Sequence, residues 1–94
     1  MNEILSLVQM DGSAREVFCE LRSVGRSEFY QANATGYKPE LVFILADYLD
    51  YNDETLVDHD GKRYRVIRTY RKDQELELVV TRASAEEADI DVKD

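Results

Sequence analysis

The segment from Glu40 to Tyr48 is the stretch that most limits what this chain can fold into, because it is apolar on both of its alternating faces. Successive side chains of a strand point in opposite directions. Both sides of this strand would be apolar, with Leu41, Phe43 and Leu45 on one side and Val42, Ile44 and Ala46 on the other. A strand of this kind is typical of a buried, central position. We therefore expect the rest of the chain to be arranged around it.

Five further segments have the pattern of strands, namely residues 4–9, 15–24, 55–58, 63–71 and 75–82. Turn sequences separate several of them: Asp11-Gly12-Ser13, Asp60-Gly61 and Lys72-Asp73-Gln74. The Asp-Gly pair is the strongest hairpin signal, since both residues tolerate positive φ. Six short strands and tight turns predict a mainly β fold, a small antiparallel β barrel or sandwich.

Alternation within these strands predicts which side chains face the core. Two sets are expected inside: Val17, Cys19 and Leu21 from the second strand, and Leu76, Leu78 and Val80 from the last. Phe18 lies on the opposite face of the second strand, where it is either exposed or covered by another segment. At Val66-Ile67-Arg68 the alternation slips, which predicts a bulge or a change to burial on both sides.

Residues 25–39 break the strand pattern. Ser27 can cap a helix that Gly36 can end, so we expect a short helical insertion between the second and third strands. Its aromatic residues, Phe29, Tyr30 and Tyr37, are costly to leave in water. They are expected either to plug an open end of the barrel or to contact a partner.

Charge is unevenly distributed along the chain. The net charge of -8 argues against nonspecific duplex binding, which depends on Lys and Arg. Half of the basic residues lie within 62–72, whereas residues 86–94 hold five acids and one lysine. This pattern indicates either electrostatic contacts with protein neighbours or a solvated strand and a solubilising tail. The length suits one domain, residues 1–83, followed by a flexible acidic tail, residues 84–94.

The candidates for catalysis and metal binding are few. Cys19 is the only cysteine and is expected to be buried and inert, and His59 is expected to be a solvated loop residue. The acids of residues 47–54 do not match an EF-hand, and the loop acids in general are expected to stay solvated. We predict no enzyme activity, no metal and no cofactor. The absence of a signal peptide or membrane-length apolar run predicts a soluble, unexported protein.

Four blocks carry a resemblance, residues 24–32, 36–40, 46–48 and 61–71. In order and spacing they resemble the phage head-closure or head-tail joining family of siphophages and prophages. The resemblance implies a small β barrel that forms a ring between the portal-adaptor complex and the tail or tail-terminator protein. Such a ring catalyses nothing and continues the channel through which DNA passes without specific binding or contact with a membrane. The expected location is the bacterial cytoplasm during assembly, then the head-tail interface of the virion.

The resemblance also implies which residues meet partners. In this family the connection between the second and third strands takes part in assembly, which here assigns that role to Arg26, Glu28, Phe29, Tyr30, Gln31, Tyr37 and Lys38. We further hypothesise that Arg63, Arg65 and Arg71 face neighbouring subunits. A DNA channel should repel phosphate, so Asp50, Asp53 and Glu54 are proposed to line it. The connection from Gln9 to Arg15 is shorter than is typical of the family.

The main alternative is a barrel of oligonucleotide-binding type. Tyr64, Tyr70 and Phe43 would stack on bases, and the Arg-rich strand would follow the backbone of a single strand. The negative net charge opposes this interpretation. A third interpretation, a protein that mimics DNA, would need acids spread along a surface, whereas many of them are in the tail. Salt-dependent binding to single-stranded nucleic acid is expected of the oligonucleotide-binding barrel and not of the joining protein, so it separates these two interpretations.

Overall fold

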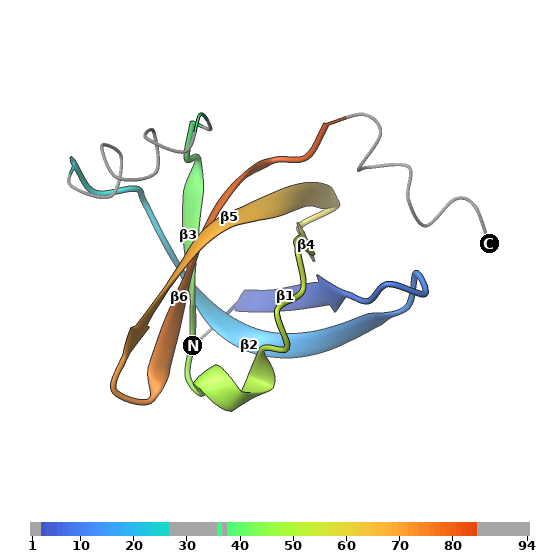
Figure 1. Cartoon of the computed structure of the whole chain (residues 1–94), viewed down its shortest axis with the longest axis horizontal. Helices are drawn as coiled ribbons and strands as arrows, with labels where there is room; N and C mark the ends of the chain where they lie inside the picture. Colours follow the sequence, from blue (N-terminus) through green and yellow to red (C-terminus); the bar gives the residue numbers. More distant parts are fainter. Residues whose placement is uncertain (1–2, 27–35, 37, 85–94) are drawn as a thin grey trace.

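Six antiparallel strands close into a barrel in the computed structural model, which describes residues 3–26, 36 and 38–84. The strands are β1 (Glu3–Val8), β2 (Ala14–Arg22), β3 (Leu41–Leu45), β4 (Leu56–His59), β5 (Lys62–Lys72) and β6 (Glu75–Arg82). Their order around the barrel is β1-β2-β3-β6-β5-β4 (Figure 1). The mainly β fold is thus confirmed, and of the two predicted architectures the chain adopts the barrel.

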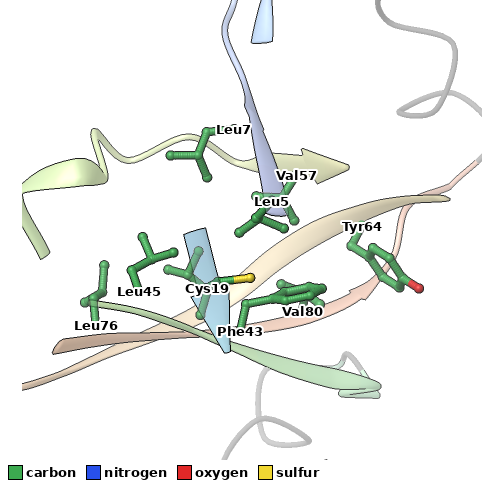
Figure 2. Close-up of a cluster of buried hydrophobic side chains, with 10 residues drawn as sticks. Leu5, Leu7, Cys19, Phe43, Leu45, Val57, Tyr64, Leu76 and Val80 are labelled. Carbon is green, nitrogen blue, oxygen red and sulfur yellow. The ribbon is translucent and has the colours of Figure 1, made fainter. Parts of the chain in front are cut away.

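The inner core receives side chains from all six strands (Figure 2). Phe43 and Leu45 of β3 belong to this core, and both are fully buried. The inward sets expected from β2 and β6 are largely confirmed, since Cys19, Leu76, Leu78 and Val80 are buried. Leu21 is the exception, because it lies near the end of β2 and is partly exposed.

A second apolar cluster lies on the outside of β3 and β6. Val42, Ile44 and Val79 are buried there, with Val24 and Ile67 packed against them. This cluster explains why β3 is apolar on both faces, as the sequence predicted. Ala46 does not join it, because β3 ends at Leu45 and Ala46 is exposed.

Two local predictions for β5 are confirmed. Asp60 and Gly61 have φ values of 52° and 78° and connect β4 to β5 in a two-residue hairpin. The register between β5 and β6 shifts between Val66 and Arg68, so Ile67 is the extra residue of a bulge. Val66 packs on the inner core while Ile67 packs on the outer cluster, and the bulge therefore lets one strand contribute to both.

The helical insertion expected between the second and third strands falls almost entirely on residues 27–35 and 37, outside the described part of the chain. Within that part, Tyr48–Asp50 forms a 3-10 helix between β3 and β4, capped by the Asp47 side chain accepting from the Leu49 N–H. β6 ends at Arg82, close to the predicted domain limit at residue 83. Of the predicted tail, only Ser84 is described.

Candidate functional site

The arginines of β5 do not form a single cluster. Arg63 faces Asp58 across the β4/β5 ladder, and its Nε and Nη2 donate to the two carboxylate oxygens at 2.7 and 2.8 Å. Such a bidentate pair fixes both side chains. Because the Arg63 side chain is only 9% exposed, little of it is left to contact a neighbouring subunit.

Arg71 lies at the opposite end of this 11-residue strand from Arg63. Its guanidinium carbon lies 3.5 Å from the centroid of the Tyr48 ring, and its Nε donates to the backbone carbonyl of Asp73 at 3.0 Å. A guanidinium over an aromatic face is attracted by the ring electrons. The structure therefore separates Arg63 from Arg71 and uses both in contacts within the chain.

Between these ends, Arg65, Arg68 and Tyr70 point outward from β5, and we call this surface the basic face. Tyr64 and Val66 pack on the inner core, which places Arg65 on the outer side. Arg68 follows the bulge opposite Val79 of the outer cluster, and Tyr70 lies two residues further on. The Arg68 guanidinium carbon is 5.9 Å from the Tyr70 ring centroid, and that ring is half exposed. Arg65 and Arg68 are partly buried, and Glu77 lies opposite Tyr70 on the same outer side of the sheet, so the basic face combines two partly buried cations with an accessible aromatic ring and a neighbouring carboxylate.

A second surface, on the outside of β1 and β2, carries an exposed apolar pair. Ile4 and Phe18 are direct cross-strand partners, with exposed fractions of 50% and 66%. Glu16 and Glu20 lie two residues either side of Phe18 on the same face of β2 and are exposed, with Glu20 paired to Arg22 at 3.1 Å. We call Ile4, Phe18, Glu16 and Glu20 the acidic-apolar face. Alternation had placed Phe18 outside, but Ile4 was missed because residues 4–9 are apolar on both faces.

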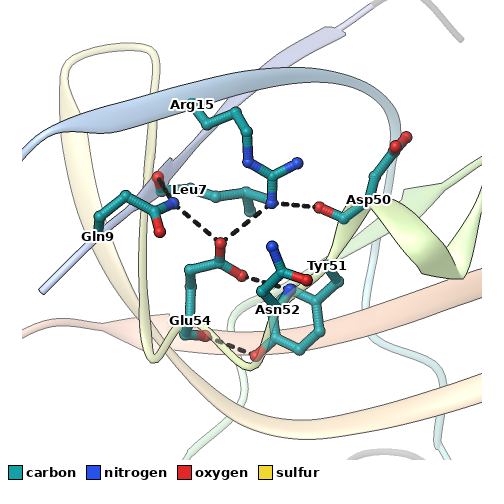
Figure 3. A network of polar contacts seen from close by, with 7 residues as sticks. All are labelled: Leu7, Gln9, Arg15, Asp50, Tyr51, Asn52 and Glu54. Carbon is teal, nitrogen blue, oxygen red and sulfur yellow. Dashed lines mark hydrogen bonds and ion pairs between the residues drawn. The ribbon is translucent and has the colours of Figure 1, made fainter.

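A polar network joins the β1–β2 hairpin to the connection between β3 and β4 (Figure 3). One carboxylate oxygen of Glu54 accepts from Gln9 Nε2 at 2.9 Å and from Arg15 Nη2 at 3.1 Å. The other accepts from the Asn52 N–H at 2.7 Å. The Tyr51 hydroxyl donates to the Glu54 carbonyl at 2.5 Å, and burial, together with Glu54 and Asp53, raises the pKa of Tyr51 to about 12.

Glu54 overturns the expectation that the loop acids stay solvated. Its side chain is only 3% exposed. Burial alone would raise its pKa, but the hydrogen bonds from Gln9, the Asn52 N–H and Arg15 hold the pKa below its usual value of 4.5. This carboxylate is used inside the chain, so we do not retain it as a channel-lining acid. Asp50 and Asp53 are exposed and remain candidates for that role.

His59 also differs from its prediction. It belongs to β4 rather than to a solvated loop, and it is mostly buried, with its ring centroid 5.0 Å from that of Phe43 and its Nε2 2.9 Å from a Glu3 carboxylate oxygen. Cys19 is fully buried as expected, and burial, with Glu3 nearby, raises the pKa of its thiol to about 11. Neither group has the environment of an activated nucleophile.

The remaining candidates divide as follows. Arg26 and Lys38 are exposed, whereas Glu28, Phe29, Tyr30, Gln31 and Tyr37 lie outside the described residues. Phe43 and Tyr64, two of the three rings expected to stack on bases, are buried, so that assignment is wrong for them. Within residues 3–26, 36 and 38–84 no group of His, Cys, Asp and Glu is placed to hold a metal ion. The helical residues among them form no stretch long and apolar enough to cross a bilayer.

The basic face and the acidic-apolar face are the candidate functional site in this part of the chain. Comparison with protein-family models and with curated proteins gave no match.

Proposed function

We propose that this protein is a structural subunit of a phage particle, a ring component that joins the portal-adaptor complex to the tail. The observation that carries the proposal is the exposed Ile4–Phe18 pair, which lies on the outer wall of a barrel whose interior is already filled. Exposed apolar side chains in contact with each other are a feature of protein-binding surfaces. The resemblance of the four sequence blocks supplies the kind of partner.

Electrostatics supports the same function over nucleic-acid binding. With a net charge of -8, the chain as a whole repels phosphate. Asp50 and Asp53 are exposed and three residues apart in the sequence, in the 3-10 helix and in the connection that follows it. In the proposed ring these two acids border the DNA channel and keep the genome from binding to its wall.

Electron microscopy of particles made without this reading frame tests the proposal. We expect filled or leaking heads separated from complete tails, because the joint between them is missing. Supplying the wild-type protein from a plasmid should restore tailed particles, and the variant Phe18→Asp, which alters only an exposed side chain, should restore fewer. Normal tailed, infectious particles after the deletion would exclude the function.

Binding to single-stranded oligonucleotides tests the alternative. The proposal predicts no salt-dependent binding, and the variant Tyr70→Ala should behave like the wild type. Tight binding that weakens with salt and is lost in Tyr70→Ala would favour the oligonucleotide-binding function instead.

A further inference from the structure

Two strands of the barrel pair with a neighbour on one side only over part of their length. Residues 14–18 of β2 pair with β1, whereas the pairing of β2 with β3 begins at Cys19. Residues 68–72 of β5 pair with β6, whereas the pairing of β5 with β4 ends at Arg65. We call these two segments the β2 edge and the β5 edge. Each has one side on which the described part of the chain supplies no partner strand.

The backbone groups on the open side of the β2 edge follow from the alternation of an antiparallel ladder, in which every second residue bonds to a given neighbour. The Gln9 N–H donates to the Ser13 carbonyl at 2.7 Å in the β1–β2 hairpin, so the odd-numbered residues that follow on β2 are directed toward β1. Glu16 and Phe18 therefore direct their N–H and C=O groups to the open side.

On the β5 edge the same alternation starts from the turn that joins β5 to β6. Lys72 and Glu75 pair across this two-residue turn. The residues that flank such a turn bond to each other, so Lys72 is directed toward β6. Thr69 and Arg71 therefore direct their backbone groups to the open side. Residues 69–72 are exposed on both faces of the strand, which leaves room for a second strand to approach.

The two edges do not pair with each other within one barrel. Arg15 of β2 donates to the carbonyl of Asp50, and the guanidinium of Arg71 lies over the ring of Tyr48, so the 3-10 helix lies between the edges. In the strand order around the barrel, β2 is three strands away from β5 in either direction (Figure 1). Each copy therefore has two separate open edges on different sides of the barrel.

We propose that the occupant of the β5 edge is the β2 edge of a second copy of this chain, so that the sheet continues from one barrel into the next. This inference rests on the proposed function, in which copies form a ring, and it names the strands through which they meet. A second copy supplies what each edge lacks, a strand with unpaired backbone groups on one side. Because the two edges differ, copies add head to tail until the ring closes.

Exposed side chains favour the pairing of unlike edges. Phe18 and Tyr70 are 66% and 50% exposed on the outer sides of their strands, and pairing places both rings on one continuous face, where aromatic cross-strand contacts are stabilising. Two β5 edges would instead bring the exposed Arg71 and Lys72 of one copy close to those of the other. The β2 edge offers the exposed carboxylate of Glu16 in their place.

Disulfide trapping between copies tests the contact. Tyr70→Cys places a thiol on the outer side of the β5 edge, and Glu16→Cys or Phe18→Cys places one on the outer side of the β2 edge; the native Cys19 is fully buried. Two positions on β2 are used because a register shift of two residues keeps the same face outward. Under oxidation, a mixture of β2 and β5 variants should form at least about tenfold more dimer than either variant alone, since paired strands bring cross-strand Cβ atoms within about 5 Å.

Leu49→Cys mixed with Tyr70→Cys is the matched control for this trapping. Leu49 is 67% exposed, close to the exposed fraction of Phe18, but it lies on the 3-10 helix outside both edges. Its thiol reports collisions between copies that do not involve the β2 edge, so this mixture should give little dimer.

Proline substitution separates backbone pairing from side-chain contact. Thr69→Pro removes an N–H that is directed to the open side, whereas Thr69→Ala removes the side chain and keeps the N–H. Edge strands tolerate proline where the N–H faces away from the sheet. Added to the Tyr70→Cys variant, Thr69→Pro should reduce trapping about tenfold relative to Thr69→Ala, because the pairing loses a donor. Circular dichroism checks that both variants are folded.

Hydrogen exchange of the wild type is an independent measurement that needs no substitution. The N–H groups of Glu16, Phe18, Thr69 and Arg71 should exchange more slowly as the protein concentration rises, because they become paired between copies. Exchange of the exposed Asp53, which lies on the connection outside both edges, should not change.

The outcomes separate this inference from the proposed function. Trapping in the mixture no greater than in the single variants or the Leu49→Cys control, equal trapping by folded Thr69→Pro and Thr69→Ala variants, or exchange independent of concentration would overturn the edge-to-edge contact. Trapping by a β2 variant alone would replace it with pairing of two β2 edges. If the deletion nevertheless produced heads without tails, the joining function would stand without this interface. If the edges paired but the deletion were harmless, self-association would stand and the joining function would fail.

Discussion

Glu54 shows how one side chain can connect parts of the chain that are far apart in sequence. A buried carboxylate is tolerated only when donors surround it. Here the donors are Gln9 and Arg15 from the β1–β2 hairpin and the N–H of Asn52 from its own connection. Arg15 also donates to the carbonyl of Asp50, so the hairpin is tied to the 3-10 helix as well.

Glu54→Gln should lower the free energy of unfolding by about 1–3 kcal/mol near neutral pH, because it weakens a charge-assisted network in a buried place. The folded-state pKa of Glu54 lies below 4.5, so its contribution is present above that pH and is lost as pH falls through the folded-state pKa. Urea denaturation across this acid range should therefore show a flatter pH dependence in the variant. Asp53→Asn is the control, because Asp53 is exposed with φ of 63°, which Asn tolerates. Equal losses in both variants would contradict the assignment.

Cys19 should react slowly with iodoacetamide in the folded protein at neutral pH. The thiol is fully buried and burial raises its pKa to about 11, so little thiolate exists and none is accessible. Mass spectrometry of labelling with and without urea measures the difference. Labelling at the same rate in both conditions would show that the second strand does not hold Cys19 inside.

At the scale of elements, predictions from sequence succeeded where the cause is local. The two-residue hairpin, the bulge around Ile67 and the burial of β3 on both faces can each be read from residues that are adjacent in the sequence. Glu54 and His59 were assigned wrongly because their partners, Gln9, Arg15, Glu3 and Phe43, come from distant strands. Pairing of β1 with both β2 and β4 brings Gln9, Arg15 and Glu3 close to Glu54 and His59, and no short sequence pattern encodes it. The same limit applies to the acidic-apolar face. Alternation in the sequence predicted that Phe18 lies outside the barrel, but it did not predict that its cross-strand partner Ile4 is exposed.

Gly61→Ala should destabilise the protein by about 1–2 kcal/mol, because Gly61 has φ of 78° and a side chain disfavours that conformation. Gly25→Ala is the matched control. A methyl group at Gly25 would meet nothing within 4 Å, and no positive φ is required there. Thermal denaturation of both variants measures the difference, and a similar fall in melting temperature for the two would argue against a strained hairpin.

At the scale of the whole molecule, stability depends on a few large side chains. In the described part of the chain the inner core holds ten buried residues, and Phe43 is the largest of those that are fully buried. It contacts the rings of His59 and Tyr64, with centroids 5.0 and 6.1 Å away. In a domain of this size, one such side chain supports a large share of the net stability.

Phe43→Ala should cost about 3–5 kcal/mol, which is the usual cost of truncating a fully buried Phe. Phe18→Ala makes the same chemical change at a site that is 66% exposed and should stay within about 0.5 kcal/mol of the wild type. Chemical denaturation of the two variants compares them directly. A large loss in Phe18→Ala would mean that the acidic-apolar face is part of the core rather than a surface for partners.

Closure of the barrel also restricts the ways in which this protein can associate. Each described strand has a hydrogen-bonded neighbour on both sides, so none of them is an open edge along its whole length. Strand addition by another copy or a peptide, a common route both to binding and to aggregation, is therefore restricted to the parts paired on one side only, such as residues 68–72 of β5 and 14–18 of β2. Elsewhere on the barrel wall, contacts must be made by side chains. Surface substitutions can therefore remove a partner while leaving the fold intact.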